Sequence, residues 1–365
     1  MVDLIIHYTI MSSPIITDDL NYIYKNLGNL KKFKNKNILI TGCAGVVGFY
    51  LSSFFKKYKN KLGISKIIGI DNNSYKSSPW TKEIFNQKNF IFLKKDINKI
   101  NFKKEKHLKK IDYIFHMATI ASPYYFNKNP INVFNTNCMA YQNMLEFYKN
   151  KKVSILYFST SEIYGTSEKK FIPTKESYVG KTTTLGPRAC YDESKRAGET
   201  LSYIYKEKYK MNIKIVRLFN TYGPGQSFQD RRAVSDFARN IFFSNKILIL
   251  SSKKYTRSFC YVSDTVVGIL KAQLHNTFDV FNIGNSNEEI NIYTLAKIFK
   301  LAAKEILNKD IKLNLKMNNR VLKDVPIRRC PDTSKARIVL GFKPTITIKS
   351  GINKYIKYLK SKKRI

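Results

Sequence analysis

The sequence predicts an α/β fold built on a doubly wound parallel sheet. Apolar runs of strand length alternate with longer segments of helical length, which is the order expected when each strand is followed by a crossover helix. The first runs are apolar almost throughout, and this is typical of strands that are covered on both faces. Three evenly spaced glycines follow the first run, and they place a tight turn between the first strand and the first helix.

The first expected strand, residues 38–40, leads into this glycine turn. Gly42, Gly45 and Gly48 are separated from one another by two residues, and an apolar segment of helical length, 49–55, follows. Such glycines permit a tight turn, a close approach of the backbone to a pyrophosphate, and close packing of helix on strand. The N-terminus of the helix adds free N–H groups and a positive dipole. The segment therefore predicts a dinucleotide-binding site.

Acidic residues follow in the next two expected strands. Asp71 ends the run 67–71, 23 positions after the last of the three glycines, near the spacing of a carboxylate that holds the adenosine ribose. No arginine follows Asp71 to receive a 2′-phosphate, so the sequence favours NAD over NADP. The next run, 89–97, ends with Asp96 and Ile97, and Asp96 is placed to bond the adenine amino group.

Other segments complete the expected sheet and its helices. A helix N-cap signal at 17–19 precedes an expected helix over 20–27. The remaining expected strands and helices lie at 111–118, 131–148, 154–161, 187–209 and 212–219, with a short returning strand at 281–284. The chain is long enough to bury a full core, as one large domain or as two intimate ones.

Tyr191 and Lys195 lie four residues apart in the expected helix 187–209, so they share one face of it. A lysine ammonium beside a phenol favours the phenolate and lowers the pKa of the tyrosine. Such a tyrosine can take a proton from a sugar hydroxyl while a neighbouring cofactor takes the hydride. Alone, a pair with this spacing is more often a solvated helix face. The glycine turn and Asp71 are what favour the catalytic interpretation.

The chain resembles the extended short-chain dehydrogenase/reductases that modify nucleotide sugars. The resemblance covers about residues 35–348 and rests on features that stand in the family's order: the glycine turn, Asp71, Asp96 with Ile97, the segment 159–165, and Tyr191 with Lys195. It implies a Rossmann-type NAD-binding domain, a smaller α/β nucleotide-sugar-binding domain built from discontinuous C-terminal segments, and a homodimer paired through 131–148 and 187–209.

The resemblance also sets the expected boundaries of four parts of the chain. They are an N-terminal leader (1–34), the NAD-binding domain (35–219 plus 258–283), the nucleotide-sugar-binding domain (220–257 plus 284–348) and a basic C-terminal helix or tail (349–365).

Catalytic roles follow from the resemblance. Thr160 is expected to bond the C4 oxygen of the sugar, Tyr191 to take the proton of the C4 hydroxyl, and Lys195 to hold the nicotinamide ribose and lower the Tyr191 pKa. The two residues after Thr160 select the reaction. Family dehydratases carry Asp-Glu there and simple 4-epimerases commonly lack the glutamate, whereas Ser161 and Glu162 form the pattern of decarboxylases.

Three segments, 186–196, 219–224 and 256–264, most resemble UDP-glucuronate decarboxylases. This implies oxidation at C4, loss of the C6 carboxylate of the resulting β-keto acid as carbon dioxide, and re-reduction by bound NADH to give UDP-xylose. Glu162 is expected near C5, while Arg257 steers the carboxylate and serves in protonation of the enolate. The implied substrate-binding residues are Tyr124, Ser161, Asn220, Arg232, Arg257 and Arg329.

Other functions stay open on the sequence. The loops 225–231 and 252–255 depart from the decarboxylase pattern and both border the substrate, so the nucleotide and the sugar are undecided, with a UDP-sugar favoured. One alternative is an NDP-sugar 4-epimerase or 4,6-dehydratase. An alternative of another class is a non-catalytic protein that binds NAD or nucleic acid.

Composition narrows the expected partners and compartment. The formal charge is +39, but the lysines are spread along the chain as expected of an AT-rich coding sequence, so nucleic acid is not the expected partner. The five cysteines show no metal-ligand or disulfide spacing, and no apolar stretch has the length of a membrane span. We therefore expect a cytoplasmic protein without a metal or a membrane contact. Residues 2–10 lack the features of a signal peptide, and Met11 is an alternative start.

Arginine has a different distribution from lysine. All twelve arginines fall in the second half of the chain, beginning at Arg188. Because arginine offers a planar fork for phosphate and carboxylate, this half is the one expected to bind the sugar nucleotide.

Overall fold

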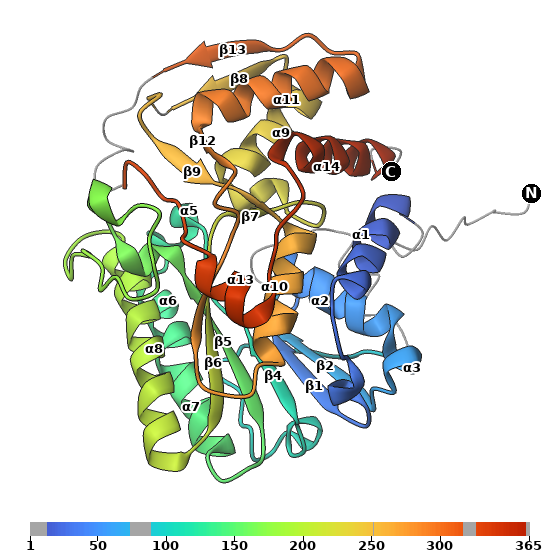
Figure 1. Ribbon diagram of the computed structural model, residues 1–365, viewed down its shortest axis with the longest axis vertical. Coiled ribbons are helices and arrows are strands. Elements are labelled where there is room, and N and C mark those ends of the chain that lie inside the picture. The colour runs from blue at the N-terminus through green and yellow to red at the C-terminus, as the bar shows by residue number, and fades with distance from the viewer. Residues whose placement is uncertain (1–12, 74–88, 251, 317–325, 363–365) are drawn as a thin grey trace, which may run out of the picture.

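Seven parallel strands form the main sheet of the computed structural model, which describes residues 13–73, 89–250, 252–316 and 326–362. Their order across the sheet is β11-β6-β5-β4-β1-β2-β3 (Figure 1). The strands are β1 (Asn37–Thr41), β2 (Lys66–Asp71), β3 (Ile91–Lys94), β4 (Tyr113–His116), β5 (Ser154–Thr160), β6 (Asn212–Leu218) and β11 (Val280–Ile283). The strand order reverses between β1 and β4, so a crevice forms beyond the carboxyl ends of these strands. The predicted α/β fold is confirmed.

The helices are α1 (Pro14–Lys25), α2 (Val46–Lys57), α3 (Lys59–Leu62), α5 (Pro123–Phe126), α6 (Pro130–Asn137), α7 (Met139–Tyr148), α8 (Ala189–Tyr209), α9 (Ala233–Phe243), α10 (Val262–Gln273), α11 (Ile292–Leu307), α13 (Ser334–Leu340) and α14 (Ile348–Lys362). Figure 1 shows α6, α7 and α8 on one face of the sheet, and α2 and α10 on the other. Within β1, Ile38 and Ile40 pack into the core beneath α2 and α10, while Leu39 packs into the core on the opposite face. A strand covered on both faces must be apolar at every position, which explains the unbroken run.

Two predicted helix boundaries were wrong. The helix expected over 131–148 is divided at Cys138 (φ −108°, ψ −67°), which ends α6 and precedes α7. There, the Cys138 thiol donates to the carbonyl of Ser194 (3.5 Å) and Asn137 Nδ2 donates to the Ser194 hydroxyl (2.9 Å). The first helix begins at Pro14 instead of residue 20, because proline fits the first position of a helix.

The N-terminal helix α1 packs against the rest of the fold. Asp19, which the sequence placed in a cap, is fully buried in the middle of α1. Its carboxylate accepts hydrogen bonds from the hydroxyls of Tyr50 (2.8 Å) and Tyr261 (2.7 Å) and from Lys354 Nζ (2.8 Å). One buried acid therefore connects α1 with α2, with the segment before α10 and with the C-terminal helix α14, which lies close to α1 in Figure 1.

Shorter strands lie above the main sheet in Figure 1, together with α9, α11 and α14. They pair as β7 (Thr221–Tyr222) with β10 (Cys260–Tyr261), β8 (Lys246–Ile249) with β13 (Lys312–Leu315), and β9 (Thr256–Ser258) with β12 (Glu289–Asn291). Most of these elements come from the two segments assigned to the nucleotide-sugar-binding domain. Helix α13 also falls in 284–348, yet it packs against β11 and α10 of the main sheet.

Candidate active site

A cavity of about 1020 Å³ lies at the carboxyl ends of β1, β2, β4 and β5 and extends to the segments above the sheet. Every residue that the sequence named for cofactor, catalysis or substrate lines it. These residues are Gly42, Gly45, Gly48, Asp71, Asp96, Ile97, Tyr124, Thr160, Ser161, Glu162, Tyr191, Lys195, Asn220, Arg232, Arg257 and Arg329. The fold therefore brings into one place residues that are up to 287 positions apart in the sequence.

Two of the three glycines in the turn, Gly42 and Gly48, are required for steric reasons. Gly42 has a positive φ of 72°, and a side chain there would place Cβ 2.9 Å from the backbone nitrogen of Ala118. At Gly48, Cβ would lie 2.5 Å from the carbonyl oxygen of Gly42. Gly45 is the N-cap of α2, so the N–H groups of the first turn of α2 begin at the cavity wall. This arrangement fits the pyrophosphate of a dinucleotide.

Two acids at or just after the ends of neighbouring strands, Asp71 and Asp96, line the same cavity as the turn. Asp71 ends β2, and its carboxylate accepts hydrogen bonds from the backbone N–H groups of Ala44 (3.0 Å) and Asn73 (2.8 Å). Burial raises the pKa of Asp71, and these two N–H groups counteract the effect. Asp96 accepts from the backbone N–H (3.0 Å) and side-chain amide (3.1 Å) of Asn98. Both carboxylates thus reach the cavity in fixed orientations, which suits a ribose and a base.

Thr160, Tyr191 and Lys195 all line the cavity, and the Tyr191 hydroxyl is hydrogen-bonded to Thr160. Thr160 is the last residue of β5 and its hydroxyl accepts from the backbone N–H of Glu162 (3.3 Å). Tyr191 lies in the first turn of α8, with its ring stacked on Phe126 at 5.1 Å between centroids. Lys195 lies one turn later and donates from Nζ to the carbonyl of Phe158 (2.7 Å).

The predicted effect of Lys195 on the tyrosine pKa is not found in this structure. The pKa of Tyr191 is raised, first by burial and then by the negative charge of Glu162, while a hydrogen bond with Thr160 counteracts both. Burial also lowers the pKa of Lys195, to about 7. A phenol beside a carboxylate in a buried site is costly to ionise, so spacing along the helix alone gave the wrong direction.

Glu162 is held by a cluster of arginines. It lies in a short 3-10 turn, Ser161–Tyr164, directly after β5. One of its carboxylate oxygens accepts from Arg188 Nη2 and the other from Arg329 Nη1. Burial alone would raise the pKa of Glu162, but the charges of Arg329, Arg188 and Arg257 outweigh it, so the pKa is below its ordinary value. Glu162 is therefore ionised and fixed in position.

Arg257 and Arg329 differ in their contacts. Arg257 Nη1 donates to the carbonyls of Thr256 (2.6 Å) and Ile327 (3.3 Å). Burial, followed by the charges of Arg329 and Arg188, lowers the Arg257 pKa to about 9. Arg329 is 7% exposed, and its Nε and Nη2 have no hydrogen-bond partner among the described residues. Buried donors without partners are unfavourable, so an anionic ligand here would be stabilised.

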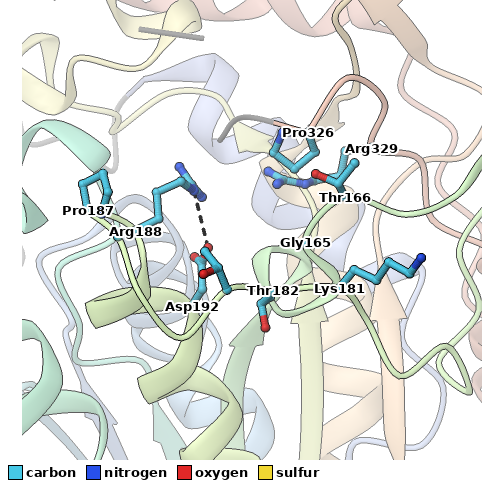
Figure 2. A pocket seen from close by; sticks show the side chains of 11 residues that line it. Gly165, Thr166, Lys181, Thr182, Pro187, Arg188, Asp192, Pro326 and Arg329 are labelled. Carbon is cyan, nitrogen blue, oxygen red and sulfur yellow. Dashed lines mark ion pairs between the residues drawn. The ribbon is translucent and has the colours of Figure 1, made fainter. Parts of the chain in front are cut away.

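Sequence reasoning missed two members of this cluster, Arg188 and Asp192. Asp192 Oδ2 lies 3.4 Å from Arg188 Nε, and both residues line a smaller cavity of about 220 Å³ next to Arg329 (Figure 2). The available signal for Arg188 was its place as the first arginine of the chain. No spacing rule singles out Asp192, which simply follows Tyr191.

The remaining predicted substrate residues lie around the rim. Arg232 caps α9, and its Nε donates to both carboxylate oxygens of Asp230 (2.8 and 3.0 Å). Asn220 Nδ2 donates to the carbonyl of Ser258 (3.3 Å). The Tyr124 ring is exposed, and its hydroxyl accepts from Lys128 Nζ (2.9 Å), which lowers the Tyr124 pKa. Ser161, by contrast, is buried beside Glu162.

Residues 38–284 match the family model described as the NAD dependent epimerase/dehydratase family. The chain belongs to this NAD-dependent epimerase/dehydratase family. The protein is therefore an enzyme that uses NAD as its cofactor. The glycine turn, the N-terminus of α2 and Asp71 fit this cofactor.

Curated relatives within the family are decarboxylases by name. The chain is 34% identical over 319 residues to UDP-glucuronic acid decarboxylase 3 of Arabidopsis thaliana, covering 87% of each protein. It is 32% identical over 331 residues to UDP-glucuronic acid decarboxylase 1 of Xenopus tropicalis, covering 91% of this chain and 74% of the relative.

Among solved structures, the chain is similar to UDP-glucuronic acid 4-epimerase from Bacillus cereus, in complex with UDP-glucuronic acid and NAD. That comparison has a TM-score of 0.75 and 25% identity, and covers 89% of this chain and 99% of the other. The epimerase Mth375 from Methanothermobacter thermautotrophicus has a TM-score of 0.78 at 22% identity, covering 96% and 97% of the two chains, and supports the fold alone. Among the helices of the described residues, none is both long and apolar enough to cross a membrane.

Proposed function

We propose that this enzyme converts UDP-glucuronate to UDP-xylose and carbon dioxide. The observation that carries the proposal is the hydrogen bond of Arg329 to Glu162, directly after Thr160 and in the cavity that Tyr191 also lines. Arg329 is buried, and its Nε and Nη2 are without partners among the described residues, so they suit the carboxylate of a uronic acid. Its Nη1 holds Glu162 next to the same sugar. The names of the curated relatives support this reaction.

The first stage is oxidation at C4. Thr160 hydrogen-bonds the C4 oxygen, and Tyr191 takes the proton of the C4 hydroxyl. Lys195 holds the nicotinamide ribose and, once the substrate and cofactor charges are in place, favours the tyrosinate. When bound, NAD supplies the acceptor for the C4 hydride and the source of its later return.

The second stage is loss of the carboxylate. A C4 ketone makes the C6 carboxylate part of a β-keto acid, so the electron pair of the breaking C5–C6 bond delocalises into an enolate. Arg329 and Arg257 hold the carboxylate before it leaves and stabilise the enolate oxygen afterwards. Glu162 stays ionised between its arginines and orders the water or arginine that returns a proton to C5. Tyr191 then returns its proton to the C4 oxygen as C4 regains its hydride, which gives the pentose.

A mass measurement of the nucleotide-sugar product tests this proposal. Purified protein incubated with UDP-glucuronate, without added oxidant, is expected to give a UDP-pentose and carbon dioxide. A product of unchanged mass would instead support the second candidate, 4-epimerisation, which the similarity to the Bacillus cereus epimerase favours. Loss of water would indicate a dehydratase. Intact NAD binding without any of these products would overturn the proposed function.

We also propose that the enzyme is a homodimer paired through α6, α7 and α8. Apolar side chains are exposed on these helices: Ile131, Phe134, Met139, Tyr203 and Ile204. Packing of these side chains against a second copy would remove them from water. Phe134→Asp is expected to convert a dimer into a monomer in light scattering, and an unchanged mass would contradict this interface.

A further inference from the structure

Asp192 lies beside the proposed reaction centre without a role in the chemistry above. It occupies the first turn of α8, immediately after Tyr191, and is 8% exposed. Its side chain borders the smaller cavity, where Figure 2 shows it turned toward Arg188. Oδ1 of this carboxylate is buried and has no hydrogen-bond partner among the described residues. A buried carboxylate is costly, so its position beside the site calls for a physical explanation.

Arg188 connects Asp192 with Glu162. Its Nε lies 3.4 Å from Asp192 Oδ2, and its Nη2 donates to Glu162. The guanidinium therefore bridges two carboxylates from different elements, α8 and the turn after β5. Because its nitrogens form a rigid planar fork, a contact at Nε restricts where Nη2 can point. The position of Asp192 therefore affects where the Glu162 carboxylate lies beside the sugar.

The charged groups that face Asp192 come from three elements. Arg188 is at the start of its own helix, Glu162 is in the turn after β5, and Arg329 is on the segment before α13. Burial raises the pKa of Asp192 to about 7, with Arg188 and Arg329 opposing the shift and Glu162 adding to it. The carboxyl group therefore changes charge close to neutral pH. Its ionised form attracts Arg188, and its neutral form does so only weakly.

We propose that ionised Asp192 is a positioning residue that holds Arg188 against Glu162 and so orients Glu162 for the step that follows C4 oxidation. The proposal rests on the proposed function for the identity of that step. It predicts that product formation, but not the first hydride transfer, increases as Asp192 loses its proton. The increase should occur around pH 7. An aspartate with an ordinary pKa would already be fully ionised there and would cause no such increase.

Asp192→Asn tests the proposal, because asparagine keeps the shape of the side chain and cannot ionise. NADH formation on the enzyme and carbon dioxide release are followed in a single turnover of UDP-glucuronate at several pH values around 7. The wild type is expected to release carbon dioxide faster as the pH rises through 7. In the variant, the ratio of carbon dioxide release to NADH formation should not change with pH there, and carbon dioxide release should be slower by about tenfold to 100-fold. Its NADH formation should stay within about twofold of the wild type.

Glu193→Gln is the matched control, since it removes an acid from the next position of α8. Glu193 pairs with Thr182 and Arg196, and it does not line the large cavity. This variant should keep the wild-type pH dependence. Asp192→Asn with an unchanged pH profile, or with both steps slowed equally, would overturn the proposal and leave a structural role.

Failure of the proposed function would be recognised separately. If the wild type forms a product of unchanged mass from UDP-glucuronate, the decarboxylase assignment fails. The wild type and Asp192→Asn are then compared by the rate at which each forms that product. If UDP-glucuronate does not react, crystal structures of the wild type and Asp192→Asn decide the point. Displacement of Arg188 from Glu162 in the variant supports the proposal, and an unchanged Arg188 contradicts it.

Discussion

Arg329 donates a hydrogen bond to the carboxylate of Glu162, although the two residues are 167 positions apart in the sequence. The segment that carries Arg329 is held in place on both sides. The backbone N–H of Ser258 donates to the Arg329 carbonyl (3.0 Å), and that of Thr174 donates to the carbonyl of Cys330 (2.9 Å). The C-terminal part of the chain thus completes the site at the end of β5.

Arg329→Lys should separate the two stages of the reaction. Lysine keeps the charge but loses the planar fork, so it cannot hold both Glu162 and a substrate carboxylate. We expect decarboxylation to fall by about 10²–10³-fold, while NADH still forms on the enzyme after UDP-glucuronate is added. Single-turnover absorbance and product mass measure the two stages.

The neighbouring Arg328 provides the control for this experiment. Arg328 pairs with Glu289 (2.7 Å) near the surface. Arg328→Lys should retain both stages. An Arg329→Lys enzyme with wild-type carbon dioxide release would remove Arg329 from the chemistry.

The parts of this structure that the sequence predicted well are those that depend on nearby residues. The glycine turn, Asp71 and the strand pattern are local, because they depend on the residues of one turn and one strand, as at Gly48, where a Cβ would meet the backbone of Gly42 and Cys43. The partners of Glu162 could not be ranked, since three arginines from distant segments compete for it and only packing decides which two reach it. The pKa of Tyr191 was mispredicted for the same reason. Burial and Glu162 determine it, and neither is visible in the spacing to Lys195.

Tyr191→Phe distinguishes an enzyme from a non-catalytic NAD-binding protein. The substitution removes only the hydroxyl that takes the C4 proton, so turnover should fall by about 10²–10⁴-fold. The NAD content of the purified protein, measured after denaturation, should not change. Tyr209→Phe, at the other end of the same helix and outside the cavity lining, should have no effect on turnover. Equal turnover in Tyr191→Phe and the wild type would exclude the proposed role.

Lys214 makes the stability of the protein depend on pH. It is buried in β6 with its Nζ on the Ser154 hydroxyl (2.8 Å), and burial lowers its pKa to about 7. Between this value and the ordinary pKa near 10.4, the unfolded chain binds the proton and the folded protein does not, so stability rises with pH.

Lys214→Met should therefore reduce this rise by up to about 1 kcal/mol per pH unit between pH 7 and 9. Urea unfolding at both pH values measures the difference between variant and wild type. Lys66→Met, at an exposed position on β2, is the control. If both variants show the same pH dependence as the wild type, Lys214 keeps its proton in the folded protein.

The buried pair of Asp19 and Lys354 should respond unequally to removal of each partner. Lys354→Met leaves the fully buried Asp19 without its cation and should cost about 3–5 kcal/mol of unfolding free energy. Asp19→Asn should cost less, since the Lys354 side chain is 33% exposed and can turn into water. Burial already raises the pKa of Asp19 despite Lys354, so in Lys354→Met the acid can take up a proton. Its folded pKa then exceeds the unfolded value, and stability falls as the pH rises. The cost of Lys354→Met should accordingly be larger at pH 8 than at pH 5, whereas Lys357→Met, exposed on the same helix, should show no such difference in urea unfolding.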